Sequence, residues 1–171
     1  GLHLASLRGG TLHNAIPREA VAVLTASSEV AEGLPGRVRD LARAIREELR
    51  QTDPDLAVAV EEETPPPRVL EAGLARRFVD LLHVMPNGVL GMSRAVPGLV
   101  ETSTNLAVAR TTGDRLEILT SQRSSVGSSL DDAAGRIAAL GRLAGFVPGH
   151  DAAYPAWTPD PDSKLLELCR G

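Results

Sequence analysis

Asn14 is the first side chain that could do chemistry, because it lies where the chain leaves an expected strand. It falls in the stretch Gly9–Ala20 (GGTLHNAIPREA), between two strand-like runs. Gly9 and Gly10 allow a bulge or a close backbone approach, and Pro17 must end a strand. The connection is longer than a two-residue hairpin turn. A carboxamide here can donate to a developing oxyanion, or it can be a turn residue that bonds its own backbone.

Arg123 is the second candidate, at the end of another expected strand. It directly precedes the serine-rich loop Ser124–Ser129, which leads into a helix. A guanidinium in this place can fork onto a carboxylate, with the helix dipole assisting. The loop could bind an anion through free backbone N–H groups, but it lacks the Gly-Lys-Ser of a phosphate loop. Simple helix capping by Ser128 or Ser129 also explains the serines, and Arg123 by spacing alone could be an ordinary exposed arginine.

Metal-ligand spacing is missing from the sequence. The run Glu61–Glu63 is followed by three prolines, which is typical of a solvated linker. The histidines form no H-x-H, H-x-x-x-H or H-E-x-x-H pattern; they are His3, His13, His83 and His150. We therefore expect no metal ligand in this chain.

Composition excludes several classes of function. The formal charge is −4, and the aromatic residues are two phenylalanines, one tyrosine and one tryptophan. Nucleic-acid binding usually needs a basic face or stacking aromatics, so it is disfavoured. Cys169 is the single cysteine, which suits a reducing compartment. No apolar run reaches membrane-spanning length and no secretory signal opens the sequence, so we expect a cytoplasmic protein with no membrane partner.

Hydrophobic periodicity predicts a mixed order of strands and helices. In the first part of the chain the pattern gives strands at 2–7, 19–25 and 56–60, with a helix at 34–49 before the third strand. In the second part it gives a helix at 69–84, a hairpin of 99–110 with 116–122, a helix from about Ser128 to Gly145, a strand or extended segment at 146–157 and a last helix near the end.

The order strand–strand–helix–strand thus occurs twice, in pseudo-repeats at about 2–62 and 99–157. Strand pairs with a helix that returns to the same sheet are typical of ferredoxin-like folds. We expect an α+β fold, in which ferredoxin-like repeats form an antiparallel sheet with helices packed on one face, and a single domain over residues 1–171.

Five separate motifs resemble the aminoacyl-histidine (Xaa-His) dipeptidases, which are carnosinase-like di-zinc metallopeptidases. They are GGTLHNAIPREA at Gly9–Ala20, MPNGV at Met85–Val89, VETSTN at Val100–Asn105, Arg123-Ser124 in SQRSSVGSS, and AAYPAWTPDPDS at Ala152–Ser163. The similarity runs along essentially the whole chain in order. In that family a lid domain interrupts the catalytic domain, and this chain resembles most of the lid.

The resemblance implies a role for both candidate residues. Asn14 matches a lid asparagine that contacts substrate near the metals, and Arg123 matches a lid arginine that holds the substrate carboxylate. The two zinc ions and their ligands would belong to the rest of the peptidase, so we expect no catalytic or metal residue here and no activity from this chain alone. The implied partners are a dipeptide substrate, the catalytic domain and a second copy in a homodimer.

A function of another class remains open from the sequence. The chain could be a stand-alone ferredoxin-like module that binds a small ligand or regulates a partner. That alternative predicts ligand-dependent stabilisation of the isolated chain without any metal.

Overall fold

A computed structural model describes residues 1–151, 154–157, 159–160 and 163–170. The motif expected at Ala152–Ser163 therefore lies partly outside the described residues. The chain forms two compact units, residues 1–6 with 22–72, and residues 7–21 with 73–171. Both candidate residues lie in the second unit.

The first unit is built around one long helix, α1 (Ser28–Glu48). It also holds most of the strands β1 (Leu2–Gly9) and β2 (Ala20–Ala26); the last residues of β1 and the first two residues of β2 belong to the second unit. The helix begins earlier than the predicted residue 34 and continues through Pro35. A proline interrupts one helical hydrogen bond, and an amphipathic helix of this length can tolerate the loss.

The prediction of a strand at Leu56–Val60 is wrong. These residues are coil, and residues 57–63 are exposed. The apolar run suits a strand, but a strand also needs a partner for its ladder. The Leu56 carbonyl instead accepts a hydrogen bond from Arg46 Nε of α1 at 2.9 Å. The expected linker character of Glu61–Glu63 is confirmed, since all three are exposed coil.

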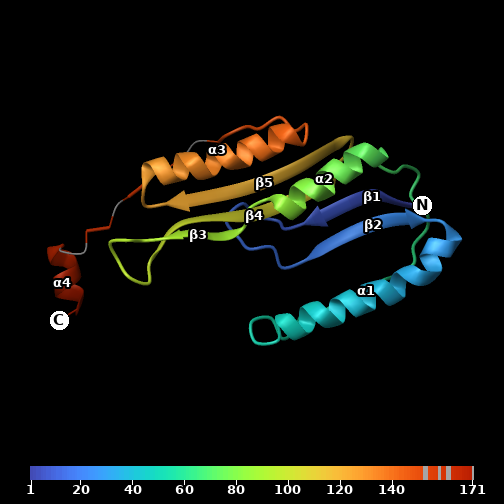
Figure 1. The fold of residues 1–171 in the computed structure, drawn as a ribbon, viewed down its shortest axis with the longest axis horizontal. Coiled ribbons are helices and arrows are strands. Elements are labelled where there is room, and N and C mark those ends of the chain that lie inside the picture. The colour runs from blue at the N-terminus through green and yellow to red at the C-terminus, as the bar shows by residue number, and fades with distance from the viewer. Residues whose placement is uncertain (152–153, 158, 161–162, 171) are drawn as a thin grey trace. The chain divides into compact units, whose positions relative to one another are not determined.

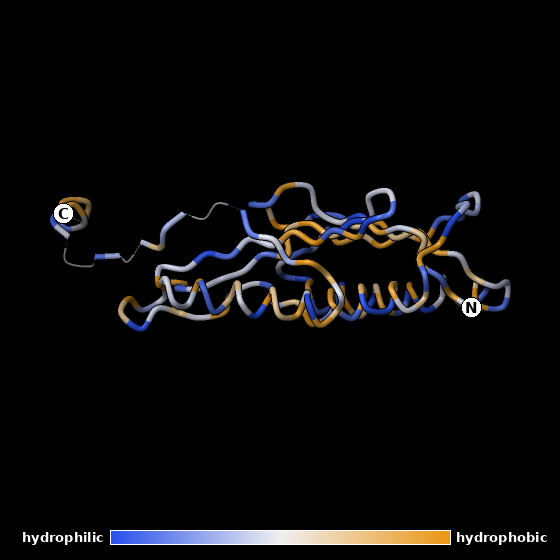
Figure 2. Tube along the Cα trace, turned by 90° about the horizontal axis from the view of Figure 1, so that it is seen from above, coloured by the Kyte–Doolittle hydropathy of each residue, from blue (hydrophilic) through white to orange (hydrophobic). Residues whose placement is uncertain are grey.

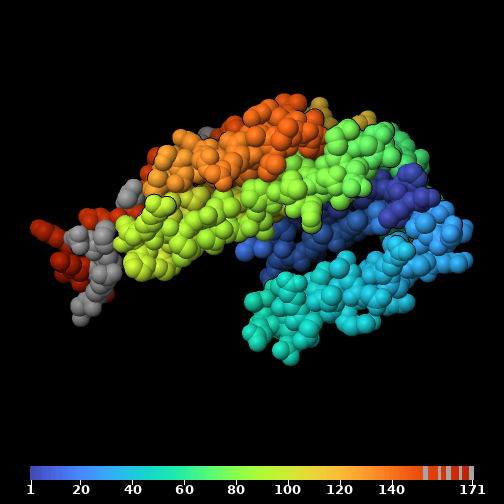
Figure 3. Space-filling model, viewed as in Figure 1, coloured from blue at the N-terminus to red at the C-terminus, as the bar shows by residue number. Residues whose placement is uncertain are grey.

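The second unit contains a long antiparallel hairpin with helices on one face. The strand β4 (Val100–Thr112) pairs with β5 (Arg115–Ser124) along its whole length. The helix α3 (Gly127–Leu143) contacts both strands. The helix α2 (Ala72–Val84) is drawn next to α3 in the view that Figures 1 and 3 share. The expected α+β class, with an antiparallel sheet, is confirmed.

The core between these helices is small and mostly aliphatic. Phe78 of α2 is fully buried and stacks on Phe146, with ring centroids 6.1 Å apart. Phe146 comes three residues after the last residue of α3, and the chain turns away from the helix at Gly145, which has a φ of 84°. The Phe146 N–H donates to the Gly141 carbonyl and the Gly145 N–H to the Arg142 carbonyl, which is a Schellman ending. In Figure 2 the helical turns change between apolar and polar colour, as amphipathic helices do.

Two details of the second unit differ from the sequence-based expectation. The N-cap of α3 is Val126, with no side-chain cap, so capping by Ser128 or Ser129 is wrong. Ser129 Oγ instead donates to Glu101 Oε1 at 3.3 Å. A short strand, β3 (Gly88–Met92), was not predicted, because its two glycines and five residues carry little strand signal. The last helix, α4, spans Lys164–Arg170.

The edge of β4 opposite β5 is shared by two strands. β3 covers its first half, where Gly88 pairs with Thr104, and the end of β1 covers its second half, where Gly9 pairs with Ala109. A gap in the edge therefore remains between these two pairs. A β-bulge lies in this gap, because Leu106 pairs with Thr120 whereas Val108 pairs with Leu119 of β5. Ala107 is the extra residue.

The loop after β1 rests directly on this bulge. Gly10 has a φ of 70°, and a Cβ at this position would lie 1.9 Å from the Ala107 carbonyl oxygen. The Gly10 N–H donates to the Glu19 carbonyl at 3.3 Å and closes the base of the loop. Only glycine allows both the left-handed backbone and this approach.

Substitution of Gly10 by alanine is expected to destabilise the protein by about 3 kcal/mol, because strain at positive φ adds to a clash with backbone. Urea unfolding followed by circular dichroism measures the change. Gly135→Ala is the matched control: Gly135 lies within α3 with open space around it, so alanine should stabilise by about 0.5–1 kcal/mol. A Gly10→Ala variant as stable as the parent would contradict the close approach.

Candidate functional site

Asn14 occupies the third position of a tight turn in the loop between β1 and β2. The Ala15 N–H donates to the Leu12 carbonyl at 3.3 Å, which closes the turn. The Asn14 side chain is exposed, and within the described residues it makes no hydrogen bond. It is therefore presented by the turn and does not bond the turn's own backbone.

The two faces of the β4–β5 hairpin differ in character. The pairing is regular over this end, with Ser103 opposite Arg123 and Asn105 opposite Ser121. Alternation of side chains places these four residues on one face. Their neighbours Thr102 and Thr104, on the other face, are only 5% and 4% exposed.

The buried face is held by a row of polar contacts. The Thr102 and Ser124 hydroxyls are hydrogen-bonded at 2.9 Å, and Gln122 Nε2 donates to Thr104 Oγ1 at 3.2 Å. Since α3 contacts both strands, this face is the one that the helix covers. The face with Arg123 is left open.

Arg123 is exposed near the end of β5 on this open face. Within the described part of the chain it has no ion-pair or hydrogen-bond partner. A guanidinium with unused donors on a fixed strand can accept a carboxylate bidentately. Placement on a strand, where neighbouring pairs fix the backbone, gives it a defined position.

One hydrogen bond brings the Asn14 loop to the same face. Asn105 Nδ2 donates to the Ala15 carbonyl at 2.7 Å, the shortest tie between the loop and β4. Asn105 is the cross-strand partner of Ser121, so it is a diagonal neighbour of Arg123, about 7–8 Å away in a regular antiparallel pair. The structure thus brings Asn14 and Arg123, which are far apart in sequence, to one surface.

A second asparagine fixes the bulge from the other side. Asn87, in the turn between α2 and β3, accepts a hydrogen bond from the Leu106 N–H through its Oδ1 at 2.9 Å. This N–H lies in the gap between β3 and β1, where no strand can bond it. Neither Asn87 nor Asn105 was singled out from the sequence, although both lie inside the motifs MPNGV and VETSTN.

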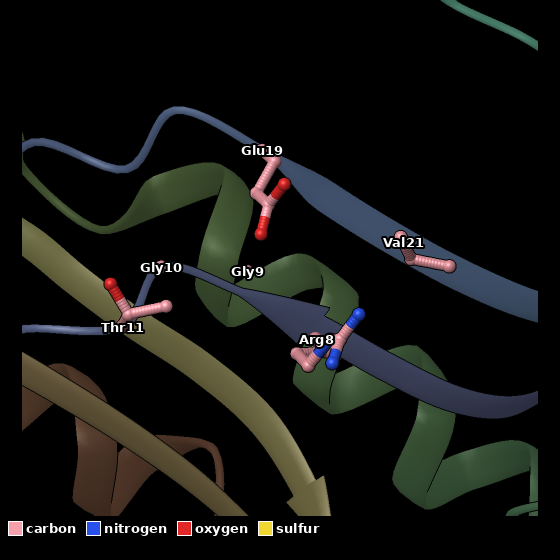
Figure 4. A pocket seen from close by; sticks show the side chains of 6 residues that line it. All are labelled: Arg8, Gly9, Gly10, Thr11, Glu19 and Val21. Carbon is pink, nitrogen blue, oxygen red and sulfur yellow. The ribbon is translucent and has the colours of Figure 1, made fainter.

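A small hollow lies at the base of the loop. Arg8, Gly10, Thr11 and Glu19 are among the residues that line it, and Figure 4 shows the Glu19 side chain directed across the strand pair toward Gly9. Its volume is about 40 Å³. Ligand pockets usually measure about 300–1,000 Å³, so this hollow is too small for a dipeptide. A second hollow of about 310 Å³ lies beside it and is lined by Gly10, Thr11 and residues 15–19 of the same loop. The open face is a surface for one side of a ligand.

A metal ion has no place among the described residues. No three His, Cys, Asp or Glu residues there come together in a way that could hold one. His3, His13 and His83 are exposed on separate segments. The part of the chain that the structure describes does not offer the donor set of a di-zinc centre, and no catalytic step is assigned to it.

None of the described helices is both long and apolar enough to cross a bilayer.

Comparison with known proteins gives two clear matches. The chain is 34% identical over 169 residues to the cytosol non-specific dipeptidase of Escherichia coli, covering 99% of this chain and 35% of that protein. It matches the crystal structure of an aminoacylhistidine dipeptidase from Vibrio alginolyticus with a TM-score of 0.93 and 33% identity, over 99% of this chain and 34% of that one. No family model matches the sequence.

The fold and the sequence together define this chain as a segment related to a dipeptidase. The resemblance to the aminoacyl-histidine dipeptidases that the five motifs indicated is confirmed. The chain spans about a third of the length of these two relatives.

Removal of the Asn87 side chain tests whether its hydrogen bond with the Leu106 N–H stabilises the bulge. Asn87→Ala leaves the Leu106 N–H without its protein acceptor, and because the bond is exposed we expect a loss of about 0.5–1.5 kcal/mol in unfolding free energy. Amide exchange at Leu106, followed by NMR, should become faster. Asn87→Asp keeps an oxygen acceptor and is the control, which should retain the protection of Leu106. Equal protection in the parent and in Asn87→Ala would contradict the assignment.

Proposed function

We propose that this chain is the substrate-orienting lid of a zinc-dependent cytoplasmic dipeptidase that hydrolyses Xaa-His dipeptides. The two zinc ions and the catalytic base would be carried by the rest of the peptidase, which in the relatives accounts for about two thirds of the length. The observation that carries the proposal is the Asn105–Ala15 hydrogen bond, which holds the Asn14 loop on the open face that displays Arg123.

Arg123 is proposed to bind the C-terminal carboxylate of the dipeptide. It is exposed and lies on a strand held by its neighbours, and its guanidinium N–H groups have no partner among the described residues. A forked pair of N–H bonds to a carboxylate fixes both the position and the orientation of the ligand. The guanidinium would thus set the distance from the end of the substrate to the reacting bond.

Asn14 is proposed to donate its carboxamide N–H to the oxygen of the scissile carbonyl. Its turn presents the side chain to solvent without a competing bond. A donor aimed at this oxygen stabilises the charge that develops there during hydrolysis. A dipeptide held at both its carboxylate and its scissile carbonyl has little freedom left, which favours reaction.

A dimerisation role is also proposed for this segment. β3 is an edge strand without charged residues, and Val89, Leu90 and Met92 are 57%, 43% and 49% exposed. Open apolar edges of this kind are suited to pairing with another chain. A second copy of the enzyme is the partner that we propose for it.

The carboxylate role of Arg123 has a sharp test in the full-length enzyme. Arg123→Ala should lower kcat/KM for a free dipeptide about 100-fold, because a charge-assisted interaction worth about 3 kcal/mol is lost. With a C-terminally amidated dipeptide, which has no carboxylate to hold, Arg123→Ala and the parent enzyme should have the same kcat/KM.

Arg115→Ala is the matched control for this test. Arg115 lies on the same face of β5 at its other end, so its removal should leave kcat/KM unchanged. An unaltered kcat/KM in Arg123→Ala, or an equal loss with the amidated substrate, would remove the assigned role.

The chain alone should hydrolyse no dipeptide. With added zinc and an Xaa-His substrate, product measured by chromatography should stay at the background level, because the described residues offer no metal site. Turnover above that of a zinc-only control would contradict the lid assignment. Large ligand-dependent stabilisation of the metal-free chain in a thermal-shift assay would favour a stand-alone binding module instead.

A further inference from the structure

We infer that Asn105 is a positioning residue, which sets the place of Asn14 relative to Arg123 by holding the loop between them. The inference rests on the proposed function and deepens it. It is carried by the 2.7 Å bond from Asn105 Nδ2 to the Ala15 carbonyl, together with the register that makes Asn105 a diagonal neighbour of Arg123.

Chemistry fixes which way the Asn105 amide points. A backbone carbonyl only accepts, so the Asn105 group facing Ala15 is the NH₂ and not the oxygen. Neither aspartate nor a hydrophobic residue supplies that donor. A residue of this length is needed to reach from the strand to the loop, and the side chain is half-buried, so water competes weakly for the bond.

The Asn105–Ala15 hydrogen bond lies at the tip of the loop, next to Asn14, so it can control the position of Asn14. Ala15 immediately follows Asn14 and closes the Leu12–Ala15 turn. The other fixed point of the loop is its base, where Gly10 lies on the Ala107 carbonyl and bonds Glu19. Among the contacts of the described residues, loss of the Asn105 bond leaves the loop anchored at its base, and the tip that presents Asn14 gains freedom to move.

The bulge explains why this connection is made from Asn105. Leu106 is the last residue in regular register with β5 before the bulge at Ala107, and over this stretch β4 has no strand on its other edge. Bulges re-aim neighbouring side chains and recur beside functional sites. The strand that carries the ladder partner of Arg123 therefore also holds the loop with Asn14.

The first experiment measures the loop itself by hydrogen–deuterium exchange in the full-length enzyme. Asn105→Ala should speed exchange over residues 11–18 about fivefold, which corresponds to the loss of one ordinary hydrogen bond. Asn105→Asp, which keeps the shape but presents an oxygen to the Ala15 carbonyl, should do the same. Unchanged exchange in both variants would overturn the inference.

Thr111→Val is the matched control. Thr111 Oγ1 accepts from the Leu7 N–H at 3.3 Å, so this substitution also removes a bond from a β4 side chain to the backbone of the N-terminal segment. It does so away from the Asn14 loop. Exchange over residues 11–18 should stay at the parent value, and a rise equal to that of Asn105→Ala would show a general structural effect and overturn the inference.

The second experiment separates positioning from a general loss of structure. Asn105→Ala should lower kcat about tenfold with little change in KM, because Arg123 still holds the carboxylate while Asn14 is misplaced. In a double-mutant cycle, adding Asn105→Ala to Asn14→Ala should cost little more than Asn14→Ala alone. Additive losses would overturn the positioning role.

The two experiments also distinguish this inference from the proposed function. If Asn14→Ala leaves kcat/KM unchanged, the role proposed for Asn14 fails, and the exchange measurement still decides whether Asn105 holds the loop.

Discussion

The contact of Gly10 with the bulge of β4 is the constraint on which the rest of the site depends. A side chain at this position would collide with the Ala107 carbonyl, so the loop can approach β4 only because its first residue is glycine. The bulge exists where β3 and β1 leave the edge of β4 uncovered. The loop occupies that gap, and its tip then comes within reach of Asn105.

In the second unit, the two faces of the β4–β5 hairpin have different roles. One face carries Thr102, Thr104 and their hydroxyl and amide partners under α3, and it fixes the two strands relative to each other. The other face carries Arg123 and the loop contact. Rigid support on one side lets exposed groups on the other keep defined positions, which is what recognition of a small ligand requires. An open surface of this kind suits a partner that closes the site from the opposite side.

Sequence patterns predicted the elements of the hairpin and its helix well, because they are long and strongly periodic. The sequence predicted that α3 stops near Gly145, and it marked Gly10 as a place of close backbone approach. Both glycines have positive φ, a conformation that favours glycine. The strand at Leu56–Val60 was wrong because periodicity cannot report whether a ladder partner exists. β3 was missed because five residues with two glycines have almost no strand signal of their own.

The sequence identified two residues of the candidate site and missed the two that hold its backbone in place. Asn14 and Arg123 were both noted from their places at the ends of expected strands, and the resemblance supplied the role expected of each. Asn87 and Asn105 were within quoted motifs, yet their roles depend on a bulge and on contacts over 19 and 90 residues of separation. No local pattern encodes such contacts. The positions of both asparagines become meaningful only once the register of β4 is known.

A crystal structure of the full-length enzyme with a non-hydrolysable Xaa-His dipeptide analogue tests the central claim most directly. The account predicts that the Arg123 guanidinium lies about 2.7–3.2 Å from the C-terminal carboxylate and that the Asn14 amide lies at a similar distance from the oxygen of the scissile carbonyl, with Asn105 still bonded to Ala15. A ligand carboxylate bound by other residues, with Arg123 and Asn14 both turned to solvent, would contradict it.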